Sequence, residues 1–261
     1  MPDLYGASAD RSNPLPPTLH RRLVTGQQGQ LRADGRCIFI GDVHGCVCEL
    51  RALLAEVVQL LRELGAFCVR GNNDDEALAA HAAWRRGEAV ADKFDFVGDL
   101  QDEDTAFLAR LPFSISLPEY SVVVVHAGLV PATPLWRQPL QAITTMRVLL
   151  RDAGGGWLPW EGKKTPTPLG ARPWAQCWPG PPHVIFGHDS KRSLQRESCA
   201  TGLDTACASG GALTAAVLPP LDVLRQSEAF RRKVDAREPV TLDDLGGVLV
   251  SVPSAQPYSP P

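Results

Sequence analysis

Short apolar runs that end in glycine-bearing turns recur along this chain. They cover residues 37–40, 67–70, 122–125 and 183–186. Runs of this length between turn residues are typical of buried strands in a sheet covered by helices. Ligands collect beyond the carboxyl ends of the strands in such sheets. The side chains that this rule brings to one edge are Asp42, His44, Asn72, His126 and His188. Together they predict a metal site that serves a hydrolytic reaction.

A different pattern fills residues 45–71. Leucine and valine at 50, 53, 54, 57, 58, 61 and 64 keep the spacing of one helix face. This pattern predicts a continuous amphipathic helix. Further along, Asp99 begins an acidic cluster before Phe107, which we interpret as a loop leading into a helix N-terminus, where negative charge is favoured.

The remaining segments suggest the domain organisation. We expect a flexible leader over 1–35, one α/β domain over 36–253 and a disordered tail over 254–261. Residues 154–182 are rich in proline and tryptophan, and we predict a long irregular loop that forms a wall of the substrate cleft. A charged segment over 222–246 is expected to be an insertion with a solvated helix at 228–234, before a final strand at 249–253.

Composition narrows the class of protein. The chain has 261 residues, 44% of them apolar, and a formal net charge of −3. Interspersed charges give no reason to expect duplex nucleic acid as a partner, and no apolar stretch is long enough to span a membrane. The seven cysteines include Cys37 and Cys68 in predicted strands, where we expect buried, reduced thiols. Cys46 and Cys48 lack the second pair of a zinc site. A cytoplasmic location is therefore expected, without a signal or transit peptide.

Several motifs in this order resemble one known family. They are Gly41-Asp42-Val43-His44-Gly45, Gly71-Asn72-Asn73-Asp74, His126-Ala127-Gly128-Leu129 and Gly187-His188-Asp189. This set is similar to the calcineurin-like metallophosphoesterases of the phosphoprotein-phosphatase superfamily. The segments 191–195 and 202–215 resemble the ApaH-like branch, which is related to symmetrical diadenosine tetraphosphatases. The resemblance implies an α/β fold, a metallophosphoesterase-type β-sandwich flanked by helices.

One motif of that family is missing. Its members carry Gly-Asp-x-x-Asp/Asn-Arg-Gly between the first two motifs, with an aspartate that bridges two metals and an arginine that binds phosphate. Residues 45–71 contain no such motif, so we expect the first sheet to lack one strand. An exon skip, a gene-model error or a genuine loss would each produce this chain.

The resemblance implies a divided metal site. Asp42 and His44 would hold one metal, and Asn72, His126 and His188 a second, while the bridging carboxylate has no counterpart. Ligands of these types suit Mn, Fe or Zn better than Ca. The family holds two such ions; without the bridge we expect at most one well-bound ion here. Asp204 is expected to fix a turn near the site rather than to bind metal.

Two further positions bear on the chemistry. Asn73 stands where the family has its general-acid histidine, and an amide cannot titrate near neutral pH. Proton supply must then come from water, or the leaving group must be a good one, which favours phosphoanhydrides. Arg147 falls where relatives place a phosphate-binding arginine, and Asn72 is a second candidate for substrate contact. A charge on a helix surface is the alternative for Arg147.

These residues lead to a specific expectation with alternatives. The first is an ApaH-like phosphohydrolase that acts on dinucleoside polyphosphates or related phosphorylated small molecules, with catalysis impaired by the missing motif. A Ser/Thr protein phosphatase or an endopolyphosphatase of the same family is the second. A non-catalytic pseudophosphatase or truncated isoform that binds nucleotide or protein is the third.

Overall fold

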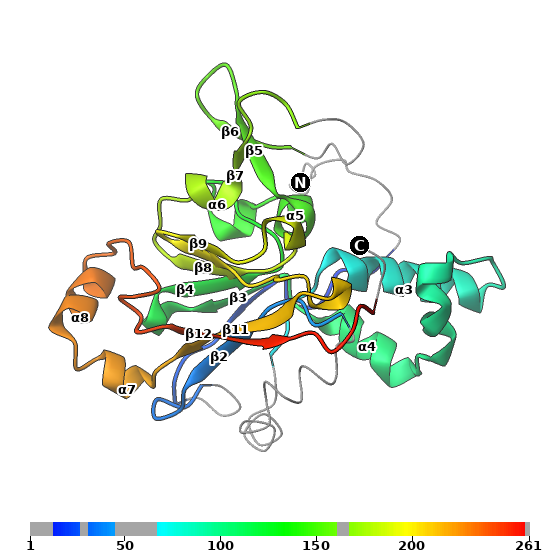
Figure 1. Cartoon of the computed structure of the whole chain (residues 1–261), viewed down its shortest axis with the longest axis horizontal. Helices are drawn as coiled ribbons and strands as arrows, with labels where there is room; N and C mark the ends of the chain where they lie inside the picture. The colour runs from blue at the N-terminus through cyan, green and yellow to red at the C-terminus, as the bar shows by residue number, and fades with distance from the viewer. Residues whose placement is uncertain (1–12, 27–30, 45–66, 161–166, 259–261) are drawn as a thin grey trace.

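Two β-sheets face each other across the main hydrophobic core of this computed structural model (Figure 1). The structure describes residues 13–26, 31–44, 67–160 and 167–258. The large sheet has the order β1 (His20–Arg22), β3 (Ser114–Leu117), β4 (Val122–Val125), β8 (His183–Phe186), β10 (Ala200–Gly202) and β9 (Gln195–Glu197). The small sheet has the order β12 (Val248–Pro253), β11 (Ala212–Leu218) and β2 (Cys37–Ile40). The prediction of an α/β sandwich is confirmed.

Strand direction in the large sheet determines where its functional side chains gather. Strand β4 runs parallel to β8, and β8 runs parallel to β10. Their carboxyl ends therefore lie at the same edge. In the small sheet β2 pairs antiparallel with β11, which pairs antiparallel with β12. The predicted strands at 37–40, 122–125 and 183–186 are thus confirmed, but they belong to two sheets rather than one.

The apolar runs are continuous because both faces of the large sheet are covered. In β8, Ile185 contributes to the core between the two sheets, whereas Val184 and Phe186 contribute to a second core on the opposite face. This alternation is the two-residue period of a strand. The sequence run at 183–186 therefore shows no polar side chain except His183, which is itself buried.

The second core lies under short helices and a third sheet. Helices α5 (Leu140–Thr145) and α6 (Trp174–Cys177) cover this face together with β6 (Trp157–Trp160), β5 (Val148–Arg151) and β7 (Arg172–Pro173) (Figure 1). Our prediction of a long irregular loop over residues 154–182 is wrong, because this segment contains β6, β7 and α6, both strands pair with β5, and Trp174 is buried at 1% exposure.

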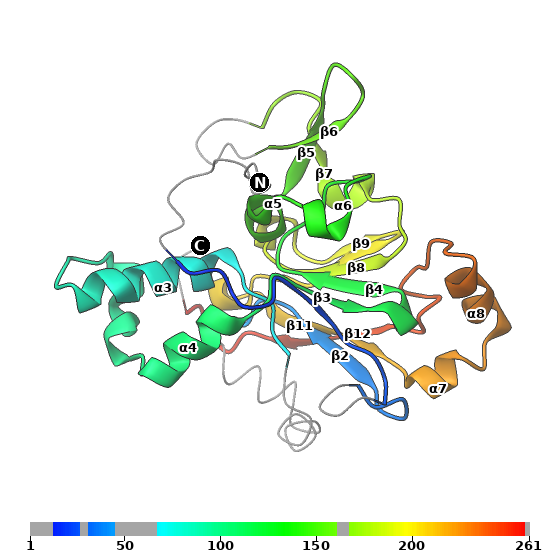
Figure 2. The ribbon, with the colours of Figure 1, turned by 180° about the vertical axis from the view of Figure 1, so that it is seen from behind.

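Four further helices among the described residues lie at the two ends of the sandwich (Figure 2). Helices α3 (Asn72–Arg85) and α4 (Asp102–Arg110) lie at one end, and α7 (Leu221–Leu224) and α8 (Glu228–Asp235) at the other. The helix N-terminus predicted at the acidic cluster is confirmed, since α4 begins at Asp102 and has three acidic residues in its first turn. Short 3-10 helices occupy Asp92–Asp99, Pro118–Tyr120, Leu135–Arg137, Ser190–Arg192 and Cys207–Ser209.

The predicted strand at 67–70 does not form. Its backbone makes no strand ladder, and Arg70 N–H donates instead to the carbonyl of Pro112 at 2.8 Å. The buried Arg70 guanidinium forms an ion pair with Asp75 and stacks over Phe113. Cys68 is exposed rather than buried. The ion pair between Arg70 and Asp75 thus holds this segment in place without a strand. Phe67 and Val69 still pack against the main core.

The expected leader, insertion and tail are more ordered than the sequence indicated. Within residues 13–26, β1 pairs with β3 and Leu23 is 2% exposed. In the charged segment the predicted helix is confirmed as α8, but Phe230 is buried in the main core together with Leu242, so the helix is not simply solvated. At the C-terminal end, Tyr258 N–H donates to the carbonyl of Ala208 at 2.7 Å. Buried apolar side chains account for the first two differences, and a backbone hydrogen bond accounts for the third.

Residues 45–66 lie outside the described residues, and so do the helix predicted there, Cys46 and Cys48. Among the described residues, β2 pairs with β11 alone, and no strand lies between β2 and α3. None of the helices in the described part of the chain is long and apolar enough to cross a bilayer.

Candidate metal centre

Four loops that leave strands bring polar side chains together. Asp42 lies two residues after β2, His126 one residue after β4, and His188 two residues after β8. Asp204 lies two residues after β10. Because β4, β8 and β10 are parallel, three of these loops begin at one edge of the large sheet. Close contact between Gly41 and Leu203 adds the loop from the small sheet.

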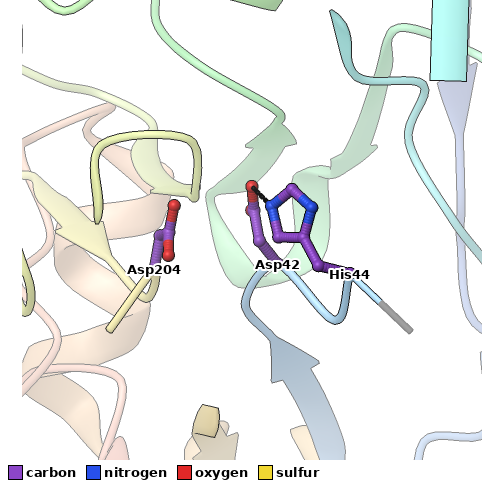
Figure 3. Close-up of side chains that lie close together, drawn as sticks. All are labelled: Asp42, His44 and Asp204. Carbon is purple, nitrogen blue, oxygen red and sulfur yellow. Dashed lines mark ion pairs between the residues drawn. The ribbon is translucent and has the colours of Figure 1, made fainter. Parts of the chain in front are cut away.

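The carboxylate group consists of Asp42, His44 and Asp204 (Figure 3). One ligand atom from each of the three lies within 4.8 Å of the other two. The Nε2 atom of His44 is 3.3 Å from Oδ2 of Asp42. Asp204 is 5% exposed, and its Oδ1 accepts a hydrogen bond from the backbone N–H of Ala206 at 3.1 Å. Two carboxylates and an imidazole at this spacing fit a divalent transition metal.

The imidazole group consists of Asn72, His126 and His188. The Nε2 atom of His126 is 2.9 Å from Oδ1 of Asn72 and 3.1 Å from Nδ1 of His188. On the other side of its ring, His188 Nε2 is 3.0 Å from the carbonyl of Thr145 and must donate to it. The Nδ1 lone pair of neutral His188 therefore faces His126. A fixed tautomer of this kind is what metal-binding histidines require.

Asp42 connects the two groups. Its Oδ2 faces His44, whereas its Oδ1 accepts a hydrogen bond from the backbone N–H of His188 at 3.2 Å and lies 4.0 Å from Nδ1 of His126. The five residues predicted from the sequence to converge are therefore brought together. Their assignment as metal ligands remains a prediction.

Glycine at two positions permits these close approaches. A Cβ atom on Gly187 would lie 1.9 Å from Oδ1 of Asp42, and one on Gly41 would lie 2.3 Å from the carbonyl oxygen of Leu203. Two candidate ligands also adopt left-handed backbone conformations, with φ of 44° at His44 and 67° at His188. Such conformations cost free energy outside glycine and concentrate at functional sites.

The crowding changes the acidities of these side chains. Burial raises the pKa of Asp42, but His126 and the hydrogen bond from His44 outweigh it and bring this pKa to about 2. Burial and the neighbouring Asp42 raise the pKa of Asp204 to about 6. The hydrogen bond to Asp42 raises the pKa of His44, whereas burial and His126 lower the pKa of His188 to about 3. Shifts in opposite directions within one cluster are typical of functional sites.

Arg147 borders the imidazole group. Its Nη2 donates to the carbonyl of His188 at 3.1 Å, and its Nε is 3.6 Å from Oδ1 of Asp189. Arg192 pairs with the other oxygen of the buried Asp189. Arg147 lies between α5 and β5 and is 39% exposed, so it is tethered beside the cluster rather than free on a helix surface.

Asn73 and the other histidines have separate surroundings. Asn73 is exposed at the second position of α3, with its Nδ2 3.5 Å from Nδ1 of His44. Next to it, Asp74 accepts a hydrogen bond from Gly71 N–H at the start of the helix. The imidazoles of His20 and His183 lie 2.8 and 2.9 Å from the hydroxyls of Ser114 and Thr201 within the large sheet, so these two histidines do not belong to the cluster.

Asp204 was expected to fix a turn near the site rather than to bind metal. It does hold a turn, as expected, through Ala206, but it also lies beside Asp42 and His44. The feature that could have predicted this closeness is the position of Asp204 two residues after β10, a strand parallel to β8. The strand itself, Ala-Thr-Gly, was too short and weakly apolar to be recognised.

The arrangement of sheets and the cluster define the class: the chain resembles the calcineurin-like metallophosphoesterases. No protein-family model matches it. A crystal structure of a candidate diadenosine tetraphosphatase superposes with a TM-score of 0.65 and 29% identity, over 90% of this chain and 98% of that one.

Within this class the resemblance is to the ApaH-like branch. A symmetrical bis(5'-nucleosyl)-tetraphosphatase of Chromohalobacter salexigens is 25% identical over 254 residues, covering 67% of this chain and 92% of the relative. The protein of the same name from Pectobacterium carotovorum is 30% identical over 38% of this chain and 44% of its own. An alignment of 254 residues that takes up only 67% of a 261-residue chain contains gaps on the side of this chain.

Proposed function

We propose that this protein is a metal-dependent phosphohydrolase of the ApaH-like type, acting on dinucleoside polyphosphates or related phosphoanhydrides. The observation that carries the proposal is the convergence of two donor groups on Asp42, one on each of its carboxylate oxygens. The names of the relatives support a nucleotide substrate. Free cysteines that are buried, such as Cys37 and Cys207, support a cytoplasmic location.

The donor chemistry supports Mn, Fe or Zn as the metal. Asp42 and His44 would hold one ion, and Asn72, His126 and His188 would hold another, with at most one of the two bound well because the family's bridging aspartate is missing from the sequence. A divalent ion so placed supplies an acidified water and a positive clamp for phosphate oxygens. The protein itself contributes fixed ligand orientations, because Thr145 holds the His188 ring and the imidazole group is largely buried.

Arg147 is proposed to bind a substrate phosphate. Its contacts with His188 and Asp189 hold the guanidinium next to the imidazole group, while 39% exposure leaves it accessible to a ligand. A planar guanidinium can donate two parallel hydrogen bonds to phosphate oxygens. Asn72 also lies at this edge, where its amide can orient substrate as well as metal.

Asn73 favours phosphoanhydrides over phosphate esters as substrates. The amide lies 3.5 Å from His44 but has no proton to give at neutral pH. A nucleoside phosphate leaves as a stable anion without being protonated, whereas a serine alkoxide does not. The position therefore supports a nucleotide or polyphosphate substrate over a phosphoprotein.

A non-catalytic relative is the second candidate. The missing motif and the gapped alignment support it, because the family's bridging carboxylate and its arginine are both absent from the sequence. Such a protein would bind metal and nucleotide without turnover.

Hydrolysis of diadenosine tetraphosphate separates the two candidates. The chain is loaded with Mn²⁺, incubated with the substrate, and the products are separated by anion exchange. We expect ADP as the product, formed by the wild type and by Asp99→Asn, but not by Asp42→Asn. Asp99 is an exposed carboxylate distant in sequence from the cluster, so its amide is a matched control. Nucleotide binding without any product would overturn the catalytic proposal in favour of the second candidate.

A further inference from the structure

We propose that Asp204 is a metal ligand, and that Asp42, His44 and Asp204 form a complete three-donor site for a divalent cation. This inference rests on the proposed function and deepens it. The sequence lacks the family's bridging aspartate, and Asp204 supplies a second carboxylate from a different part of the chain.

The spacing of the three side chains fits one ion. Their ligand atoms lie within 4.8 Å of one another. Ligand atoms on opposite sides of a transition metal are about 4.2 Å apart, because each bond is about 2.1 Å long. Small side-chain rotations therefore suffice to close the site. Figure 3 shows Asp204 on the opposite side of Asp42 from His44.

The backbone around Asp204 fixes this position. Leu203 N–H donates to the carbonyl of Phe186 at 2.8 Å, which ties the loop after β10 to the end of β8. Gly41 approaches Leu203 so closely that any Cβ atom would clash with its carbonyl oxygen. Asp42 and Asp204 are thus held side by side by the two loops rather than by mutual attraction.

The charge of this pair supports a cation. Two carboxylates, one 5% exposed and the other with 10% of its side chain exposed, face one another. Among the described residues, the ion pairs of Asp42 are with the histidines His44 and His126, and no lysine or arginine pairs with either carboxylate. Buried carboxylates are normally paired or bound to metal.

The turn contact does not by itself require a charged side chain. Asp204 Oδ1 accepts one hydrogen bond, from Ala206 N–H. An asparagine can make the same bond with its amide oxygen. Asp204→Asn therefore keeps the turn and removes the negative charge, which makes it a test of metal binding rather than of folding.

Binding of Mn²⁺ to the metal-free full-length protein tests the proposal, by calorimetry and by the loss of the free Mn²⁺ electron paramagnetic resonance signal. We expect Asp204→Asn to weaken binding at one class of site by at least about tenfold, because ligand charge sets affinity in oxygen-rich sites. Asp99→Asn is the matched control and should bind like the wild type.

Melting temperatures measured with and without Mn²⁺ add a signature that a purely structural role would not give. Without metal, Asp204→Asn should melt at or above the wild-type temperature, since one of two facing carboxylates is gone. With Mn²⁺, its gain in melting temperature should be smaller than that of the wild type. A lower metal-free melting temperature together with wild-type Mn²⁺ affinity would mean that Asp204 only holds its turn, and would overturn the proposal.

Asp42→Asn distinguishes this failure from failure of the proposed function. If Asp42→Asn loses Mn²⁺ while Asp204→Asn retains wild-type affinity, the metal centre stands and only the role of Asp204 is wrong. If the wild type itself binds no Mn²⁺, the metal-dependent function and the inference are both overturned.

Discussion

The two halves of the candidate metal centre differ in charge and in how they are built. The carboxylate group joins the small sheet to the loop after β10 and contains two acids. The imidazole group joins α3 to the large sheet and contains only neutral donors when its histidines are unprotonated. His188 has a lowered pKa and is neutral at physiological pH, whereas the pKa of His44 is raised.

This difference suggests that the halves fail in different ways. Neutral, largely buried donors depend on the orientation of their rings, which the carbonyl of Thr145 fixes for His188. Paired carboxylates repel each other without a cation and depend on the backbone to hold them. Variants that affect one half, or both, can therefore separate the two contributions.

The largest effect is expected for Asp42→Asn. Asp42 faces both groups, so the loss of its charge should remove Mn²⁺ from both. If the wild type turns over diadenosine tetraphosphate, we expect kcat/KM to fall by about 1000-fold, which corresponds to about 4 kcal/mol of transition-state stabilisation. Steady-state kinetics measure this, and a variant within tenfold of the wild type would contradict a shared role for Asp42.

His188→Ala should remove the imidazole group alone. His126 loses its neighbour His188, while its contact with Asn72 remains. Mn²⁺ affinity at this half should fall by about 100-fold or more, because loss of a residue that only orients a ligand already costs roughly 10–100-fold. Binding at the carboxylate group should persist. Calorimetry that shows loss of all sites would mean that the two halves act as one unit, and an unchanged isotherm would exclude His188 as a ligand.

Gly187→Ala tests whether steric space keeps the halves together. The added Cβ would lie 1.9 Å from Asp42 Oδ1 and must displace that carboxylate. We expect Mn²⁺ binding to weaken by about tenfold and the melting temperature to fall. Gly98→Ala is the matched control, since its Cβ would meet only the Trp84 ring at 3.4 Å. Equal behaviour of the two variants would show that Asp42 need not approach Gly187.

Arg147→Ala should affect the substrate rather than the metal. Inhibition by inorganic phosphate should weaken by about tenfold, the loss expected for one charge-assisted hydrogen-bonded contact. Mn²⁺ affinity should change little. Arg196→Ala removes an exposed arginine paired with Asp243 and serves as the control. If the two variants respond alike to phosphate, Arg147 is not a phosphate ligand.

The smallest effect is expected when the ion pair between Lys233 and Asp244, outside the metal centre, is broken. Its Nζ and Oδ2 atoms are 2.7 Å apart. Burial raises the pKa of Asp244, but the hydrogen bonds from Lys233 and Thr241 outweigh it, so this pKa is lowered from 3.8. The ionised carboxylate therefore adds stability above pH 3.8 that is lost as the pH falls through the folded-state value. Asp244→Asn should lower the melting temperature at neutral pH by about 2 °C, the effect of roughly 1 kcal/mol in a domain of this size.

That difference should disappear in acid and should be the same with and without Mn²⁺. Thermal melts across a pH series provide the measurement. A dependence on Mn²⁺ would mean that metal binding reaches beyond the two groups, which would weaken the contrast between them.

The strands that end at the site are predictable from the sequence because their runs of apolar residues are unambiguous. Four successive valines at 122–125 cannot be solvated on either face, and the structure covers both. The strand predicted at residues 67–70 does not form. Arg70 is buried there because it pairs with Asp75, which lies outside the apolar run. A local pattern does not show such compensation.

The sequence by itself determined the class of chemistry, since carboxylate, imidazole and amide donors after buried strands leave few alternatives. It also showed which family motif is absent. Only the tertiary structure decided that the strands belong to two facing sheets, and that Asp204 lies beside Asp42. The physical reason is that this neighbourhood depends on contacts across 162 positions of the chain, between Gly41 and Leu203. No local periodicity encodes such a contact.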